Sequence, residues 1–280
     1  MKNQTNKNKS TTAQIGIIGF GNMAEAIVAG LLAKKIITKN NFNVLEPAAN
    51  RVSLCKKKYT KHVYSDTSVF LQNSQIILIA VKPQQINDVL NSLGVLSAGT
   101  LVLSIVTGIT FTTYQKYLGQ KTKIIRIMPN TPALVQAGMT GYVANKYCNK
   151  KDKTFCELIF SAIGLIMEFK NEQALNAVTA VSGSGPAFVY EYARAMIQGA
   201  TKLGLTNAQA KILVLQTLSG AVQMMQTSKE SPEELRVKVT SKNGTTEAGL
   251  NYLSEKEFVK TIEICLKKAQ LRATALSKST

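Results

Sequence analysis

The chain has 280 residues, of which 45% are apolar and 18% are charged, and this composition fits a globular protein with one large domain or two moderate ones. The net charge of +18 comes from lysines spread along the chain without interleaved aromatic residues, so it indicates a solvated basic surface rather than a nucleic-acid-binding one. No apolar run reaches the roughly 18 residues that a membrane-spanning helix needs, so no membrane partner is expected.

The first elements are a strand and a helix that follow a polar N-terminus. Residues 1–12 are rich in Lys, Asn and Thr, which predicts a disordered basic tail and no signal peptide. Ile15–Ile18 is a short apolar run typical of a buried parallel strand. An apolar helix then starts near Asn22 and continues to about Leu32.

The turn between this strand and this helix, Gly19 to Ala24, has the form G-x-G-x-x-A. Gly19 permits a tight turn, and Gly21 has no side chain, so its backbone can approach a pyrophosphate. Ala24 is small enough for the helix to pack close to the strand, and the helix N-terminus offers free N–H groups to phosphates. The motif predicts a dinucleotide site, the alternative being a plain strand-to-helix turn in another α/β fold.

A second strand is predicted at Phe42–Leu45, and Glu46 follows it, about twenty residues after the glycines. An acidic side chain at this place accepts hydrogen bonds from the ribose hydroxyls of an NAD-type cofactor and repels a 2′-phosphate. Arg51 and Lys56–Lys58, on the next predicted helix, would offset that charge if they turn inward. The alternative for Glu46 is a solvated carboxylate at the end of a strand.

Further short apolar strands alternate with helices as far as Lys170. This alternation argues for an α/β fold with a doubly wound, Rossmann-like parallel sheet over residues 13–170, an NAD(P)-binding domain. Ligands of such sheets bind outside the carboxyl ends of the strands. The further strands are predicted at His62–Tyr64, Ile76–Ala80, Thr100–Ile105 and Lys123–Ile127, and the segments expected at the ligand edge are Gly19–Ala24, Glu46, Ala80–Pro83, Ser104–Gly108 and Met128–Pro132.

Two of these segments carry polar side chains that suit a cofactor. Lys82 either contacts a ribose or phosphate or lies in water. Because Pro129 and Pro132 have no N–H to donate to a sheet, the segment around them is predicted to be a rigid loop. Its Asn130 and Thr131 would hold an amide-bearing ring, and the alternative is a plain rigid turn.

Beyond Lys170 the strand-like runs stop, and residues 171–280 are predicted to form a second, all-helical domain for dimerisation and substrate binding. The helix Gly185–Leu203 is apolar on most sides and should be buried on most sides. About 110 residues of apolar helices form a thin core alone, so a second copy of the chain is expected to cover them. Capping-box patterns that mark helix starts are Thr206 with Gln209, Ser231-Pro232 with Glu234, and Ser254 with Glu257.

Two hydroxyl-rich loops of this half suit an anion. Val181–Ala187 supplies hydroxyls and free N–H groups at a helix N-terminus. In Thr240–Thr246, the glycine at position 244 lets the backbone close around a ligand such as a carboxylate. The alternative for each is an ordinary helix–helix connection.

The cysteines indicate neither a metal site nor a disulfide framework. Cys55, Cys148, Cys156 and Cys265 are scattered without a C-x-x-C pair, and His62 is the only histidine. No bound metal is expected, and the compartment is expected to be reducing and cytoplasmic.

These motifs, in this order, resemble the pyrroline-5-carboxylate reductase family over nearly the whole chain after residue 12. The resemblance implies reduction of a cyclic imine, L-1-pyrroline-5-carboxylate, to L-proline, the final step of proline biosynthesis, with NADPH or NADH. It also implies an N-terminal dinucleotide-binding domain and a C-terminal helical dimerisation domain. The motifs are Gly16-x-x-Gly19-x-Gly21-x-Met23-x-x-Ala26, Ala80–Pro83, Met128–Pro132, Ser182–Ala187 and Val239–Glu247.

The resemblance also implies site residues and an assembly. Dimers of the family often assemble further into a decamer, and the active site lies between one subunit's cofactor and helices that include the partner's. Ser241, Gly244, Thr245 and Thr246 match the loop that binds the substrate carboxylate. Thr246 matches the hydroxyl beside the substrate nitrogen. The residues expected to bind the cofactor are Gly19, Phe20, Gly21, Asn22, Met23, Glu46, Ala80, Val81, Lys82, Pro83, Pro129 and Asn130.

The residues agree with the chemistry of imine reduction. The reaction needs a hydride donor about 3–3.5 Å from the imine carbon and a protonated imine nitrogen. Such a nitrogen can arrive protonated from water, so no strong protein acid is required, and neither loop carries His or Cys. Thr246 would hydrogen-bond the nitrogen and orient it or relay a proton.

Two positions depart from the family's pattern. Ser241 is followed by Lys242-Asn243 instead of the usual Pro-Gly; because Asn tolerates a left-handed backbone, the turn is expected to survive. Lys242 adds a charge near the expected carboxylate. Glu46 stands where many members carry Ser or Asn for an NADP 2′-phosphate, and this leaves the cofactor preference open.

Two rival functions would account for parts of the same sequence. A β-hydroxyacid dehydrogenase has similar domains but needs a lysine acid/base on a helix of the second domain. The helix after Ser182–Gly185 has no lysine until Lys202, about four turns in. The positive charge suggests a nucleotide-sensing or nucleic-acid-binding module, for which the chain has no recognised motif.

Overall fold

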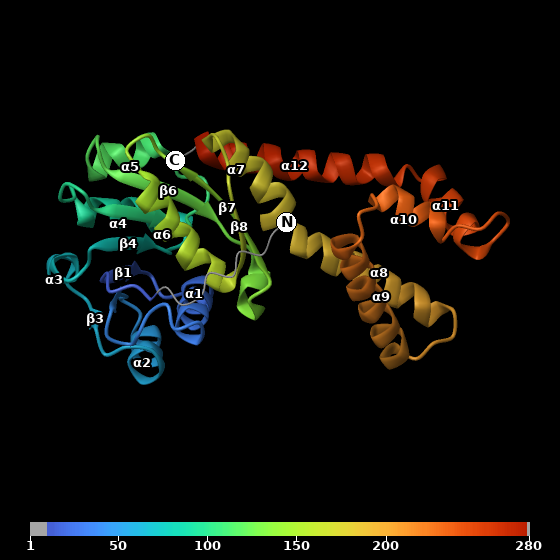
Figure 1. Ribbon diagram of the computed structural model, residues 1–280, viewed down its shortest axis with the longest axis horizontal. Coiled ribbons are helices and arrows are strands. Elements are labelled where there is room, and N and C mark those ends of the chain that lie inside the picture. Colours follow the sequence, from blue (N-terminus) through green and yellow to red (C-terminus); the bar gives the residue numbers. More distant parts are fainter. Residues whose placement is uncertain (1–9, 279–280) are drawn as a thin grey trace. The chain divides into compact units, whose positions relative to one another are not determined.

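The computed structural model describes residues 10–278 and divides the chain into two compact units (Figure 1). The first unit comprises the chain up to Ser184 together with the residues from Ala269 on, and the second comprises Gly185–Lys268. Within residues 10–278 no helix is both long and apolar enough to cross a membrane.

The first described residues are held against the first unit. Of the tail predicted at residues 1–12, residues 1–9 lie outside the described residues. The N–H of Thr11 donates to the Ile36 carbonyl at 2.9 Å, and the Thr11 carbonyl accepts from the Asn41 side chain at 2.7 Å. The fixed part of the chain therefore begins before residue 13.

An eight-stranded sheet, counted over the described residues, forms the centre of the first unit in the order β3-β2-β1-β4-β5-β6-β7-β8. Neighbouring strands are parallel except β6 and β7. Ile18 pairs with both Leu45 and Ile79, so the carboxyl ends of β1, β2 and β4 meet at one edge. The strands are β1 (Ile15–Ile18), β2 (Phe42–Leu45), β3 (Val63–Tyr64), β4 (Ile76–Ile79), β5 (Leu101–Ser104), β6 (Lys123–Met128), β7 (Gly138–Ala144) and β8 (Gly164–Glu168).

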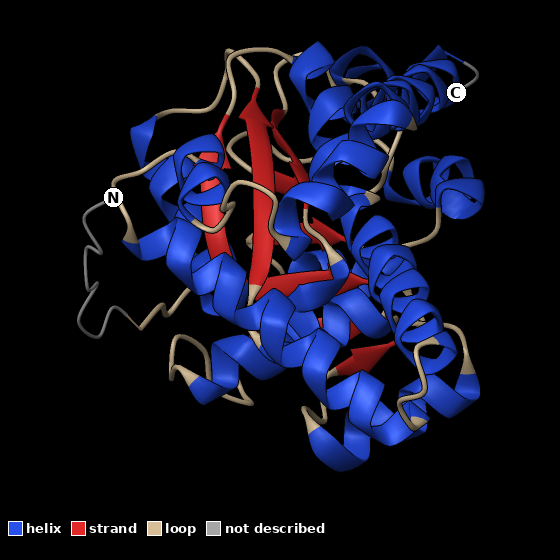
Figure 2. Ribbon diagram, turned by 90° about the vertical axis from the view of Figure 1, so that its right-hand side faces the viewer, coloured by secondary structure: helices blue, strands red, loops and turns tan. Residues whose placement is uncertain are grey.

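Helices cover both faces of this sheet, as Figure 2 shows for the strands drawn in red. Because successive side chains of a strand point to opposite faces, Ile17 packs in a core with α1, α2 and α6, whereas Ile18 packs in a core with α3, α4 and α5. The predicted doubly wound α/β fold is confirmed. The helices are α1 (Asn22–Ala33), α2 (Ala49–Lys58), α3 (Thr67–Gln72), α4 (Ile86–Leu93), α5 (Phe111–Leu118), α6 (Lys150–Phe160) and α7 (Glu172–Val178), with short turns η1 (Pro83–Gln85), η2 (Thr131–Val135), η3 (Ser161–Ile163) and η4 (Thr179–Gly183).

Three elements, β7, α6 and β8, are present that the sequence pattern did not predict. β7 runs antiparallel to β6 and contains Gly138 and Gly141, residues with a low preference for strands. β8 begins at Gly164 and leaves much of its length half-buried or exposed, so it lacks a continuous apolar run. The signal for α6 is present in the sequence as a capping box, since Asn149 and Asp152 each accept the other's backbone N–H.

The packing of the first unit extends beyond the boundary predicted at Lys170. Leu175 and Val178 of α7 pack against Val143 of β7. The Asn176 side chain also donates to the Thr274 hydroxyl at 3.2 Å, which ties the end of the chain to this unit. The pattern change at residue 170 therefore marks the end of the last strand, whereas the compact unit continues to Ser184.

The second unit is helical, and α8 packs against α9 within it. In a single copy of the chain, Ala193 is the one residue of α8 that is buried, so the burial expected for this helix depends on a second copy. Large apolar side chains such as Tyr190, Ile212 and Met224 are more than half exposed. The helices are α8 (Gly185–Lys202), α9 (Asn207–Thr227), α10 (Pro232–Lys238), α11 (Thr245–Glu255) and α12 (Phe258–Lys278).

Two of the three predicted capping boxes are confirmed. The Thr206 and Ser231 side chains cap α9 and α10. The third is wrong, because Ser254 lies inside α11 and Glu257, at a left-handed φ of 50°, joins α11 to α12.

The predicted loop over Val181–Ala187 is also wrong. Residues Thr179–Gly183 form the π-helical turn η4, and α8 begins at Gly185. The N–H of Ser184 donates to the Thr179 carbonyl at 2.8 Å and is therefore not free for an anion.

Candidate functional site

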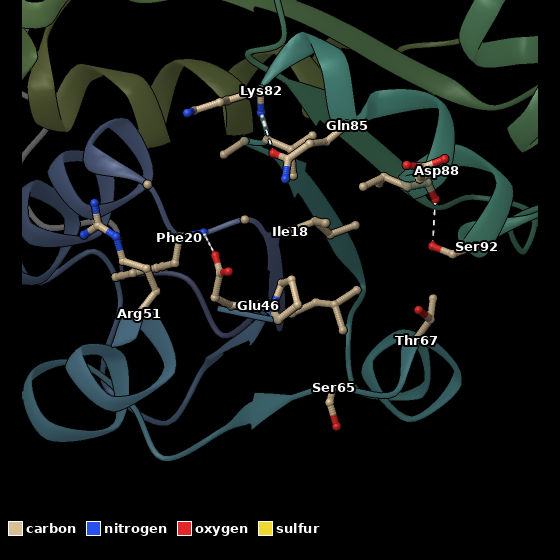
Figure 3. A pocket seen from close by; sticks show the side chains of 17 residues that line it. Ile18, Phe20, Glu46, Arg51, Ser65, Thr67, Lys82, Gln85, Asp88 and Ser92 are labelled. Atoms are coloured by element: carbon tan, nitrogen blue, oxygen red, sulfur yellow. Dashed lines mark hydrogen bonds between the residues drawn. The ribbon is translucent and has the colours of Figure 1, made fainter. Parts of the chain in front are cut away.

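A cleft of about 430 Å³ opens at the carboxyl ends of β1, β2 and β4 (Figure 3). β1 pairs with β2 on one side and β4 on the other, so the cleft lies where the order of the strands reverses, the place where doubly wound sheets bind ligands. Its lining residues are Ile18, Gly19, Phe20, Gly21, Leu45, Glu46, Pro47, Arg51, Ser65, Thr67, Ala80, Val81, Lys82, Gln85, Asp88, Val89 and Ser92.

The two glycines of the turn differ in what surrounds them. Gly19 has a left-handed φ of 82°, and a Cβ there would lie 2.7 Å from Val81 Cγ1 and 3.1 Å from the Ala80 carbonyl oxygen. A Cβ at Gly21 would meet no atom within 4 Å. Gly21 is also the N-cap of α1 without a side-chain capping bond, so bare backbone at the start of this helix lines the cleft. This cradle fits a pyrophosphate.

Glu46 is fixed by the backbone around it. The residue is 8% exposed. One carboxylate oxygen accepts the Phe20 N–H at 2.7 Å and the other accepts the Ala48 N–H at 2.9 Å. The carboxylate thus ties the glycine-rich turn to the end of β2, an arrangement that is visible in Figure 3.

Arg51 reaches the cleft from the first turn of α2. Its guanidinium donates to the Asn22 side chain at 2.7 Å and lies 3.4 Å from a carboxylate oxygen of Glu25. Glu25 also accepts the Tyr59 hydroxyl at 2.8 Å, and this hydrogen bond, together with Lys58 and Arg51, lowers the pKa of the Glu25 carboxyl. A polar network therefore orients Arg51 beside the start of α1.

Most of the residues predicted to bind the cofactor meet in this cleft. Gly19, Phe20, Gly21, Glu46, Ala80, Val81 and Lys82 line it. Phe20 contributes backbone, because its ring is buried against the Tyr59 ring with centroids 5.4 Å apart. Asn22 borders the cleft through Arg51, whereas Met23, Pro83, Pro129 and Asn130 do not line it.

Asn130 instead crosslinks three parts of the first unit. Its amide oxygen accepts the Met139 N–H at 2.8 Å, and its amide nitrogen donates to the Ser182 carbonyl at 3.2 Å and the Ser182 hydroxyl at 3.3 Å. These bonds join the start of η2 to β7 and to η4. In this structure the side chain braces the loop that follows β6.

Polar residues that were not predicted from the sequence line the far end of the cleft. Ser65 follows β3, and Gln85, Asp88 and Ser92 come from η1 and α4. The last three are spaced three and four residues apart, which puts them on one helix face. That spacing, directly after the predicted strand that ends near Ala80, was the available signal.

The predicted substrate loop forms a tight turn in the second unit. Asn243 adopts a left-handed φ of 58°, as the sequence analysis expected of an asparagine there, and its N–H donates to the Glu247 carboxylate at 2.7 Å. A Cβ at Gly244 would collide with the Ser241 side chain and lie 3.0 Å from the Ser241 carbonyl oxygen. Gly244 is the N-cap of α11 without a side-chain capping bond, so the N–H groups of the first turn are open to a ligand.

The cysteines and the other side chains that could ligate a metal lie within residues 10–278. Cys55 and Cys156 are buried, and burial raises the pKa of the Cys55 thiol to about 11. Over residues 10–278, no three His, Cys, Asp or Glu side chains come together in a way that would hold a metal ion.

The fold and the cleft define an NAD(P)-binding α/β oxidoreductase with a helical second domain. Residues 14–108 match a family model described as NADP oxidoreductase, coenzyme F420-dependent, and residues 172–276 match the model of the pyrroline-5-carboxylate reductase dimerisation domain. A pyrroline-5-carboxylate reductase of Synechocystis is 40% identical over 265 residues, which cover 95% of this chain and 98% of that protein. The chain belongs to the pyrroline-5-carboxylate reductase family.

Solved structures agree with this assignment. A pyrroline-5-carboxylate reductase from Coxiella burnetii superposes with a TM-score of 0.89 at 35% identity, covering 95% of this chain and 99% of that one. The Plasmodium falciparum pyrroline carboxylate reductase with NADP bound has a TM-score of 0.86 at 32% identity, covering 96% and 99%. The helices of residues 172–276 are therefore those of a dimerisation domain.

Proposed function

We propose that this chain reduces L-1-pyrroline-5-carboxylate to L-proline with NADPH or NADH, as the final step of proline biosynthesis. The observation that carries the proposal is the cleft at the carboxyl ends of β1, β2 and β4, where Gly21 and the uncapped start of α1 present bare backbone to a ligand. Similarity to the family over 95% of the chain supplies the substrate.

The cofactor is assigned to the first unit. Gly19, Gly21 and Asn22 would hold the pyrophosphate at the N-terminus of α1, and Lys82, exposed at the rim of the cleft, would contact a phosphate or ribose. Family resemblance alone assigns four further residues to the cofactor site: Met23, Pro83, Pro129 and Asn130. When bound, the reduced nicotinamide supplies the hydride.

The substrate is assigned to the turn at the start of α11 in the second unit. The open N–H groups of Thr245 and Thr246, with the Ser241 hydroxyl, would bind the substrate carboxylate, and the helix dipole favours an anion there. The close approach of Gly244 to Ser241 leaves no room for a side chain. The Thr246 hydroxyl would hydrogen-bond the ring nitrogen and orient it or relay a proton.

The assembly is proposed to go beyond a dimer. The exposed apolar side chains of α8 and α9 belong to a dimerisation domain, which supports a homodimer. A decamer made of five dimers is proposed from the family resemblance, and sedimentation velocity tests it. A cytoplasmic location stays a prediction from the scattered cysteines.

Absorbance at 340 nm tests the activity, with pyrroline-5-carboxylate and either NADPH or NADH. Oxidation of either cofactor is expected, and Thr246→Ala should lower kcat about 100-fold while cofactor binding is kept. Thr227→Ala is the matched control, because the Thr227 hydroxyl donates to the Gln223 carbonyl of its own helix.

The assay tests the proposed reaction and the role of Thr246 separately. Folded protein that oxidises neither cofactor would overturn the proposed reaction. Unchanged kinetics of the Thr246 variant would remove this hydroxyl from the mechanism and leave the reaction in place.

A further inference from the structure

The cleft of the first unit is lined by charges of both signs. Glu46 and Arg51, which both follow β2, differ in how much of their hydrogen-bonding capacity is already used within the protein. The carboxylate of Glu46 has each oxygen bonded to a backbone N–H, from Phe20 and from Ala48. These two bonds hold the turn together, which accounts for a carboxylate at the end of β2 without a ribose, although each oxygen keeps a second lone pair. The carboxylate therefore does not by itself establish a preference for NADH.

Arg51 is the cation nearest in sequence to this turn that lines the cleft. Its side chain is 29% exposed, and two of its N–H groups point to Asn22 and Glu25. A guanidinium has five N–H donors in a planar fork, so the remaining donors are open to a ligand. Glu25 keeps Tyr59 and Lys58 as partners if Arg51 turns to an anion.

The other basic residues of α2 lie elsewhere. Lys56–Lys58 line a separate groove of about 390 Å³ together with Lys39 and Lys61. Of the cations that could offset Glu46, α2 thus places one in the dinucleotide cleft and three outside it.

We propose that Arg51 binds the 2′-phosphate of NADPH and makes this chain prefer NADPH to NADH. An arginine near the end of the second strand is suited to this role, because its fork pairs with two phosphate oxygens at once. Asn22 holds the guanidinium at the start of α1, and Glu46 braces the turn below. This inference rests on the proposed function, since it requires the cleft to bind a dinucleotide.

Calorimetric titration of the full chain with 2′,5′-ADP and with 5′-AMP isolates the 2′-phosphate without turnover. The wild type should bind 2′,5′-ADP about tenfold or more tightly than 5′-AMP. Arg51→Ala should weaken 2′,5′-ADP about 10- to 100-fold and leave 5′-AMP unchanged. Lys58→Ala, from the same helix and also bonded to Glu25, should change neither. Circular dichroism of each variant verifies the fold.

The outcomes separate this inference from the function beneath it. The role of Arg51 is overturned if the wild type binds the two probes equally, or if Arg51→Ala weakens both equally. In either case, imine-dependent oxidation of NADH would show that the proposed function still holds. Binding of neither probe by folded wild type overturns both. A fall in the ratio of kcat/KM for NADPH to that for NADH in Arg51→Ala supports the inference.

Discussion

Gly19 and Gly21 belong to one motif, and the structure predicts opposite consequences of adding a methyl group to each. At Gly19 the left-handed φ of 82° and the nearby Val81 and Ala80 atoms both oppose a side chain. At Gly21 nothing lies within 4 Å, and the methyl group would project into the cleft. Gly19→Ala should therefore damage the fold, and Gly21→Ala should damage ligand binding.

The magnitudes follow from the surroundings of each residue. A left-handed backbone costs a residue with a Cβ roughly 1–2 kcal/mol, and overpacking against Val81 and the Ala80 carbonyl adds about 1–3 kcal/mol, so Gly19→Ala should lose about 2–5 kcal/mol of stability. Gly21→Ala restricts the unfolded chain, and this stabilises the folded protein by about 0.4–1 kcal/mol. Alanine is also a poorer N-cap than glycine, which destabilises the protein by a similar amount. The free energy of unfolding of this variant should therefore change little. Its affinity for NADPH should fall at least about tenfold, or about 1.4 kcal/mol.

Urea unfolding followed by circular dichroism measures the first effect, and a titration that follows NADPH fluorescence measures the second. Each variant is the control for the other, because both add one methyl group to the same turn. Wild-type affinity in Gly21→Ala would show that no pyrophosphate passes this backbone. Wild-type stability in Gly19→Ala would show that the turn is not held in the conformation described.

Two further substitutions test the electrostatics of the first unit. Glu172→Gln leaves the buried Arg126 guanidinium without its ion pair and should lower the free energy of unfolding by about 3 kcal/mol, whereas Glu191→Gln, in an exposed pair, should leave the urea midpoint unchanged. Equal effects of the two would contradict the role given to burial. The Tyr59 hydroxyl lowers the pKa of Glu25 below its ordinary 4.5, so the stability that this carboxylate contributes is present above pH 4.5 and is lost as the pH falls through its folded pKa. Tyr59→Phe should therefore show a smaller loss of urea midpoint between pH 7 and pH 3 than the wild type, and an identical loss would refute this assignment.

The strands of the first half could be predicted because their burial follows from local composition. Runs such as Ile76–Ile79 are apolar on both faces and are covered by helices on both sides in the structure. β7 and β8 were missed because glycines and partly exposed positions break their pattern. What defines these two strands is their pairing with each other across the intervening helix α6, such as Gly138 with Gly164, and not their own composition.

The candidate site was predictable to the extent that it depends on backbone. The motif indicated which glycine adopts a tight turn and which lies open to a ligand. The helix caps at Thr206 and Ser231 could be predicted because each side chain bonds to a backbone N–H only three residues further along the chain. Side chains whose partners come from other elements were less predictable. Asn130 bonds to Ser182, 52 residues away, and this bond cannot be read from the spacing of either motif.

The sequence by itself determined the alternation of strands and helices as far as β6, the glycine-rich turn and the left-handed turn at Asn243, because steric preference and periodicity act over a few residues. The tertiary structure decided where charged side chains point. It turned Glu46 back onto the Phe20 N–H, placed Arg51 in the cleft and sent Lys56–Lys58 to another groove. These outcomes depend on how helix α2 lies against the sheet, and a side chain's distance to a partner on another element is set by that packing.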